Sequence, residues 1–183
     1  MKIEPFAVEE WMSTYEHGVE YNLAETCVKP FHLQEFLALV GVEEIPDMQL
    51  TYGHIPGSPA LRTELARLYH GQAPDNILIG GGAIGANFLV FYTLVEPGDT
   101  VISIFPTYEQ LYRVAESFGA TVKRWMLRQE NSFLPDLDDL KQLIDGRTKL
   151  IVINNPHNPS GALIEEEMLG YICRLAEDCG AYL

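Results

Sequence analysis

After about residue 50, short apolar runs alternate with longer segments of helical periodicity, and this alternation restricts the possible folds more than any other feature. It is typical of a parallel α/β sheet. We expect an α/β fold with strands at residues 77–79, 100–104, 120–127 and 150–153, and a further strand beginning at 181–183. Ser58 as a helix cap, glycines that close helices, among them Gly180, and prolines place the intervening helices at residues 58–71, 82–94, 108–118, 137–144 and 165–179.

The first fifty residues are less regular. Helices are predicted at residues 8–17 and 33–40, each followed by a glycine, and prolines and glycines break the rest into extended or looped chain. A length of 183 residues allows one domain, or one and a fraction, with room for a hydrophobic core.

Composition excludes several classes of partner. The chain has 12 Lys and Arg against 26 Asp and Glu, a formal charge of −14, so it would be repelled by nucleic acid and by anionic membrane surfaces. No apolar run approaches the roughly 20 residues of a membrane helix. Three cysteines without C-x-x-C spacing indicate neither a disulfide framework nor a zinc site. Cys173 and Cys179 fall in one predicted helix, and we expect both to be ordinary buried thiols. An acidic start is unlike a signal peptide, and we expect a cytoplasmic protein.

A glycine cluster at residues 80–85 satisfies G-x-G-x-x-G between a predicted strand and a predicted helix. A dinucleotide-binding fold also needs an acid at the end of its second strand, where this chain has Ile104, Phe105 and Pro106. That interpretation is therefore weak. A glycine-rich turn entering a helix can still hold a phosphate on its free N–H groups, or it can simply let strand and helix pack closely.

A loop rich in asparagine and proline, residues 154–161, directly follows the predicted strand at 150–153. Loops at the carboxyl ends of parallel strands carry ligands in open α/β sheets, and asparagine offers both donors and acceptors. A plain polar turn is the alternative, although two Asn-Pro pairs are unusual for a mere connection.

Several motifs in the right order resemble those of class I/II aminotransferases, which belong to the fold-type I superfamily of pyridoxal-phosphate enzymes. The loop 155–161 resembles NPxNPTG, and the sequence after Tyr52 resembles Y-x4-G-x-x-x-L-R. The remaining matches are Gly82-Ala83, Pro97-Gly98-Asp99 and Pro106-Thr107-Tyr108. The resemblance implies that residues 51–183 are an incomplete three-layer α/β/α large domain. It also implies that residues 1–50 are a small-domain and subunit-contact segment.

The resemblance also assigns roles to individual residues. Asn158 would hydrogen-bond the phenolic oxygen of the cofactor, and Tyr108 would stack on its pyridine ring. The N–H groups of Ala83 and Ile84 would bind the phosphate, and Tyr52 would reach the phosphate of the neighbouring subunit in a homodimer. Tyr108 could instead be a core or rim aromatic residue and Tyr52 a surface one. The implied cofactor-binding residues are Gly82, Ala83, Ile84, Tyr108, Asn158 and Tyr52.

Other residues near these motifs receive no role in the chemistry. His157 lies in a loop, where histidine is more often solvated than catalytic. Arg62 is predicted to be structural, and residues 165–167 to be a solvated acidic face at a helix N-terminus.

Pyridoxal chemistry also needs a lysine that forms a Schiff base and an acid that holds the pyridine nitrogen protonated. None of the five lysines lies in a Ser-x-x-Lys context, and the family's D-E-x-Y segment would follow residue 183. We therefore expect the N-terminal part of an enzyme that transfers an amino group between an amino acid and a 2-oxo acid. The chain by itself would be inactive, and we assign it no catalytic residue and no metal ligand. Alternatives are a β-lyase or amino-acid cyclase on the same scaffold, a non-catalytic phosphate-binding fragment and, more weakly, a nicotinamide-dependent oxidoreductase.

Overall fold

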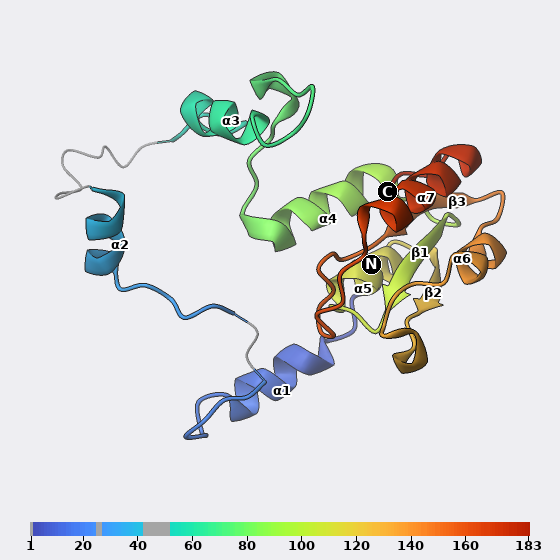
Figure 1. Cartoon of the computed structure of the whole chain (residues 1–183), viewed down its shortest axis with the longest axis horizontal. Helices are drawn as coiled ribbons and strands as arrows, with labels where there is room; N and C mark the ends of the chain where they lie inside the picture. The colour runs from blue at the N-terminus through green and yellow to red at the C-terminus, as the bar shows by residue number, and fades with distance from the viewer. Residues whose placement is uncertain (1, 25–26, 42–51) are drawn as a thin grey trace. The chain divides into compact units, whose positions relative to one another are not determined.

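The computed structural model describes residues 2–24, 27–41 and 52–183 (Figure 1). The chain divides into two compact units: Met1–Val19 with Gly81–Leu183, here called the sheet unit, and Glu20–Gly80, the second unit. The predicted domain boundary between residues 50 and 51 lies outside the described residues and stays a prediction. The elements are α1 (Ala7–Tyr15), α2 (Leu33–Val40), α3 (Pro59–Ala66), η1 (Pro74–Asn76), α4 (Gly82–Leu94), β1 (Thr100–Phe105), α5 (Gln110–Ser117), β2 (Thr121–Met126), η2 (Gln129–Asn131), α6 (Leu137–Leu143), β3 (Thr148–Val152) and α7 (Glu166–Cys179).

The sheet unit contains three parallel strands in the order β2-β1-β3. β1 is the central strand, and its first five residues are buried. Such a run is expected for a parallel strand that is covered on both faces. The strands predicted at residues 100–104, 120–127 and 150–153 are therefore confirmed as elements, with ends that differ by one or two residues.

Alternate residues of β1 enter two separate cores. Ile102 and Ile104 pack with Trp125 in a cluster that includes residues of α6 and α7. Val101 packs in another cluster, which includes residues of α4 and α5. Because successive side chains of a strand point to opposite faces, these two clusters are the two helix–sheet interfaces of a three-layer α/β/α arrangement. The predicted fold class is confirmed.

Residues 181–183, predicted to begin a further strand, pair with the sheet at a single position. Tyr182 forms a parallel bridge with Leu150. The N–H of Ile151 donates to the carbonyl of Tyr182 at 2.8 Å, and the N–H of Tyr182 donates to Lys149 at 3.0 Å. This segment therefore lies along the side of β3 away from β1.

The second unit contains α2, α3 and η1. Ser58 caps α3 as predicted, since its Oγ accepts a hydrogen bond from the N–H of Leu61 at 3.2 Å, but the helix ends at Ala66 rather than near residue 71. The predicted structural role of Arg62 agrees with its contacts: Nε donates to the carbonyl of Ile77 at 2.9 Å and the guanidinium pairs with Asp75 at 3.1 Å.

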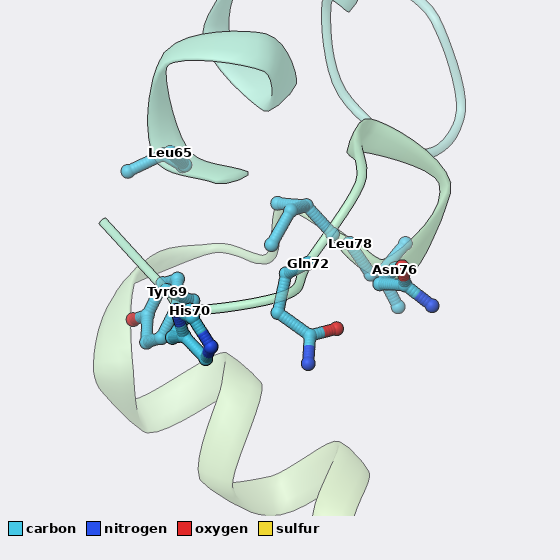
Figure 2. Close-up of a pocket in the computed structure, with 7 residues that line it drawn as sticks. Leu65, Tyr69, His70, Gln72, Asn76 and Leu78 are labelled. Atoms are coloured by element: carbon cyan, nitrogen blue, oxygen red, sulfur yellow. The ribbon is translucent and has the colours of Figure 1, made fainter. Parts of the chain in front are cut away.

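The predicted strand at residues 77–79 is wrong. These residues form no strand, and Leu78 is 65% exposed. Ile79 instead packs on Gly57, whose φ of +102° and contact with this side chain leave no room for a Cβ atom. Both Ile77 and Leu78 line an open hollow of about 530 Å³, together with Tyr69, His70 and others (Figure 2). An apolar triplet forms a strand only beside another strand, and no described strand of this chain pairs with it.

Two smaller findings concern cysteines and membranes. Cys173 is exposed and Cys179 is half-buried, so the expectation of two buried thiols is wrong for Cys173.

Among the described residues, no helix has both the length and the apolar character that crossing a bilayer requires.

Candidate functional site

The candidate site lies where the sheet changes direction. From β1 the chain passes through α5 to β2 on one side, then through α6 to β3 on the other side of β1. The carboxyl ends of β1 and β3 are therefore neighbours at a topological switch point, the usual ligand position in open α/β sheets. Tyr108 follows β1, and the 154–161 loop follows β3.

Tyr108 lies two residues before α5, because that helix begins at Gln110 rather than at residue 108 as predicted. Its hydroxyl donates to Glu9 Oε1 of α1 at 2.8 Å, and its ring meets Phe6 edge-on at 5.8 Å. Desolvation, followed by the hydrogen bond and negative charge of Glu9, raises the pKa of Tyr108 from 10.0 to about 12. The phenol therefore stays protonated, and α1 fixes the position of the ring.

Glu109, next to Tyr108, is 8% exposed. Its carboxylate accepts hydrogen bonds from the N–H of Val8 at 3.3 Å and from the hydroxyl of Tyr112 at 3.1 Å, and it lies 3.7 Å from Arg113 Nε. A carboxylate at the first turn of α1 complements the helix dipole. Glu9 binds Tyr108 and Glu109 binds the N–H of Val8, so both glutamates join α1 to the segment that carries Tyr108.

Asn158 lies in a loop held by its own asparagines. Its N–H donates to Asn154 Oδ1 at 2.7 Å. Asn155 exchanges two hydrogen bonds with the backbone of Ile164, at 3.1 and 2.8 Å. The carboxamide of Asn158 is exposed and has no partner within residues 2–24, 27–41 and 52–183, so it is available to a ligand.

His157 is buried, at 3% exposed, and the expectation of a solvated loop histidine is wrong. Its Nε2 lies 2.7 Å from the carbonyl oxygen of Pro106, in the loop after β1, and its Nδ1 lies 2.6 Å from Ser160 Oγ. Since a carbonyl can only accept, Nε2 carries the proton, and in the neutral ring Nδ1 accepts from the serine hydroxyl. The imidazole thus links the loop of Asn158 to the loop of Tyr108.

The first turn of α4 presents unpaired N–H groups. The helix begins at Gly82 without a side-chain cap or an acidic residue in its first turn. Within the described part of the chain, the N–H groups of Ala83 and Ile84 have no acceptor. Gly82 has a φ of +72°, which favours glycine, and its Cβ position meets open space. A turn of this kind can bind an anion.

Gln110 holds this turn of α4 against the start of α5. The side chain is 3% exposed, and its Nε2 donates to the carbonyl of Ile84 at 2.6 Å. Its Oε1 accepts from Asn87 Nδ2 at 3.3 Å, which fixes the orientation of the amide. The turn predicted to bind phosphate is therefore tied to a residue two positions after Tyr108.

One buried hydroxyl at this place lacks a partner. Thr107 Oγ1, next to Tyr108, is buried and makes no hydrogen bond with any described residue. An unsatisfied buried hydroxyl costs about 1–3 kcal/mol, and such groups often mark a ligand site.

Hydrogen bonds thus link the three elements that carry five of the six predicted residues, while the cofactor-binding roles of these five stay predictions: Gly82, Ala83, Ile84, Tyr108 and Asn158. The sixth, Tyr52, is fully exposed in the second unit, and its predicted role stays a prediction. Glu9, Gln110 and His157 were missed as parts of the site. Glutamate and glutamine carry no local signal, whereas a histidine between two Asn-Pro pairs could have attracted attention.

The chain belongs to the class I and II aminotransferase family, whose model matches residues 40–183. It is 33% identical over 162 residues to capreomycidine synthase of Streptomyces vinaceus, covering 86% of this chain and 42% of that protein. It is 38% identical over 109 residues to an aspartate aminotransferase of Pyrococcus horikoshii, covering 60% of this chain and 28% of that one.

A crystal structure of a PLP-dependent aminotransferase from Streptococcus suis superposes with a TM-score of 0.93 and 43% identity. The superposition covers 100% of this chain and 50% of that one. The chain therefore spans half or less of the length of these three relatives.

The residues present fit pyridoxal phosphate. The unpaired N–H groups of Ala83 and Ile84 suit its phosphate, and the unpartnered carboxamide of Asn158 suits its phenolic oxygen. The aromatic ring of Tyr108 suits its flat heterocycle. The orphaned Thr107 hydroxyl adds a polar group that a bound molecule or water could satisfy.

Proposed function

We propose that the whole protein is a pyridoxal-phosphate-dependent aminotransferase, transferring an amino group between an amino acid and a 2-oxo acid, and that this chain forms most of its cofactor cradle. One observation carries the proposal. Two buried side chains, His157 and Gln110, connect the three elements predicted to hold the ring, the phenolic oxygen and the phosphate. Membership of the family supports the same conclusion.

When bound, the cofactor supplies an electron sink for bonds at the amino-acid α-carbon. The chain's own residues bind and orient it. The first turn of α4 would donate backbone N–H groups to the phosphate, and Asn158 would donate to the phenolic oxygen without taking its charge. Tyr108 would stack on the ring as a neutral phenol, because its pKa of about 12 keeps it protonated at any physiological pH.

The lysine and the acid that complete the chemistry are proposed to come from outside this sequence. Lys123 is held by Asp145 at 2.8 Å and by the carbonyl of Leu143 at 2.6 Å, while Lys141 pairs with Asp138 at 2.7 Å. Lys149 lies in β3, with its Nζ 5.6 Å from the ring centre of Tyr182. We propose that the chain alone binds the cofactor without catalysis, and that the whole protein works as a cytoplasmic homodimer.

A test should avoid the aldehyde, which would react with surface lysines. Pyridoxamine 5′-phosphate has the same ring and phosphate without the aldehyde and is fluorescent. We expect saturable binding to the 183-residue chain and competition by inorganic phosphate. Asn158→Ala and Tyr108→Ala should each weaken binding by about tenfold, on the scale of a lost hydrogen bond to a charged group or a lost aromatic contact.

Matched controls are Asn131→Ala in η2 and Tyr171→Ala in α7, which lie outside the site. Equal binding by all variants, or no saturable binding by the unaltered chain, would contradict the cradle.

A second reaction on the same scaffold has specific support, because one of the relatives is a capreomycidine synthase rather than an aminotransferase. The whole protein can separate the two. An aminotransferase consumes one 2-oxo acid for each amino acid, whereas a lyase or cyclase converts the amino acid without any 2-oxo acid. Mass spectrometry of both products, with and without a 2-oxo acid, decides between them.

A further inference from the structure

The segment from the end of β1 to the first residue of α5, residues 106–110, has a polar connection at each end. His157 contacts its first residue, Pro106, and the side chain of its last residue, Gln110, contacts α4. Tyr108 lies at the middle of this segment. From this arrangement we propose that His157 and Gln110 are positioning residues, which make residues 106–110 a hub that sets the loop of Asn158 and the first turn of α4 relative to Tyr108. This inference rests on the proposed cofactor site and adds the residues that align it.

The backbone around His157 is fixed within its own loop. Its N–H donates to the carbonyl of Ala162 at 2.8 Å, and its carbonyl accepts from the N–H of Gly161 at 2.7 Å. Ser160 Oγ, which contacts Nδ1, also accepts from the N–H of Ala162 at 3.2 Å. With the backbone and Nδ1 held by the loop, only the Nε2 side of the ring reaches across to Pro106, 51 residues earlier in the chain.

Burial makes this contact matter. His157 is 3% exposed and Pro106 is partly buried, so losing the donor would leave a partly buried carbonyl without its protein partner. Asn158 is the next residue after His157, so a shift of this ring also shifts the carboxamide that the resemblance assigns to the cofactor.

Gln110 performs the same task at the opposite end of the hub. It is the first residue of α5, and both ends of its buried amide are used by α4, at Ile84 and at Asn87. Ile84 itself carries one of the unpaired N–H groups. A movement of Tyr108 relative to the phosphate-binding turn would therefore break a buried hydrogen bond.

Two substitutions separate the two nitrogens of His157. In His157→Asn the side-chain amide can take the place of Nδ1 but cannot reach Pro106. In His157→Gln the longer amide places its nitrogen near the position of Nε2 and can still donate to that carbonyl. The matched control is Asn155→Ala, because among the described residues the side chain of Asn155 bonds only to Ile164, in the same connection between β3 and α7.

Hydrogen–deuterium exchange of the unliganded chain tests the hub without cofactor. We expect His157→Asn to speed exchange by about three- to tenfold in both 154–162 and 105–113, with α6 unchanged. His157→Gln should leave 105–113 close to the unaltered chain, and Asn155→Ala should affect only its own loop. The proposal is overturned if His157→Asn leaves 105–113 unchanged, or if Asn155→Ala disturbs 105–113 equally.

A second measurement covers the case in which His157→Asn fails to fold. Nitrogen-15 spectra of the unaltered chain should show a single His157 tautomer protonated at Nε2, because the partner there is a carbonyl. A ring that averages between the two tautomers would overturn the link to Pro106.

Cofactor binding connects the hub to function. His157→Asn and Gln110→Leu should each weaken pyridoxamine 5′-phosphate binding by about tenfold, and His157→Gln should recover most of the affinity. Unchanged affinity in both would overturn the positioning role. If the unaltered chain binds no cofactor, the proposed function fails, while the exchange experiment still decides whether the hub exists.

Discussion

The two units of the chain differ in how much of their apolar surface they bury. Every buried hydrophobic residue of the described chain lies in the sheet unit except Ala66. In the second unit, α2 contains no buried residue, and Leu39 is 69% exposed. Burial of apolar surface is the main favourable contribution to folding, at about 25 cal/mol per Å². The sheet unit therefore has a core of its own, whereas the described residues of the second unit leave apolar faces exposed.

The largest expected contrast is between two helical leucines. Leu140 of α6 is fully buried, so Leu140→Ala should lower the free energy of unfolding by about 2–5 kcal/mol. Leu39→Ala in α2 should change it by less than about 0.5 kcal/mol. Urea unfolding followed by far-ultraviolet circular dichroism measures both. Similar losses in the two variants would break the comparison between the units.

Helix caps give a smaller contrast. Asp136 Oδ1 accepts from the N–H groups of Asp138 and Asp139 at the start of α6, at 2.8 and 3.4 Å. Asp136→Ala should therefore cost the sheet unit about 1 kcal/mol. Ser58→Ala removes the equivalent cap of α3, and we expect faster local exchange there with no change in the unfolding of the sheet unit. A shift of the main transition by Ser58→Ala would show that the two units unfold together.

Acid should weaken the sheet unit through Asp145. Hydrogen bonds from Lys123 and from the N–H of Arg147 lower the pKa of Asp145 from 3.8 to about 2. A depressed pKa in the folded chain adds stability above about pH 4, and that stability is lost as the pH falls from about 4 to about 2. Asp145→Asn should reduce the loss of unfolding free energy between about pH 4 and pH 2 by up to about 1 kcal/mol. The effect is no larger because the pair with Lys123 is partly exposed and screened by solvent.

The matched variant for this test is Glu64→Gln in the second unit, where the ion pair with Arg67 is exposed on both sides. Thermal unfolding between pH 2 and pH 6 should show no change in acid sensitivity for Glu64→Gln. An unaltered acid profile in Asp145→Asn would show that this carboxylate does not stabilise the sheet unit.

The smallest expected effect concerns the attachment of α1 to the sheet unit. The pKa of Tyr108, raised to about 12 by burial and by Glu9, adds stability below pH 10 that is lost as the pH rises from about 10 to about 12. Ultraviolet titration of the chain, minus that of Tyr108→Phe, should isolate this phenol. Glu9→Gln should lower its pKa by removing the negative charge. No response to Glu9→Gln would mean that α1 is not held at Tyr108.

Much of the site could be predicted because its residues belong to short local sequence patterns. The glycines before α4, the aromatic residue after β1 and the paired Asn-Pro steps after β3 are each readable within a few positions. His157 and Gln110 could not be predicted in this way, because the residues they contact, Pro106 and Ile84, lie far from them in the sequence. His157 and Pro106 are 51 positions apart in the sequence and become adjacent only when β1 and β3 pair.

The sequence by itself determined the alternation of strands and helices, the caps at Ser58 and Gly180 and the order of the motifs, because these depend on periodicity and on the chemistry of neighbouring residues. Only the tertiary structure decided that residues 77–79 form no strand and that His157 is buried. A strand needs a partner strand and a buried ring needs a cover, and both depend on contacts between distant parts of the chain that no local pattern encodes.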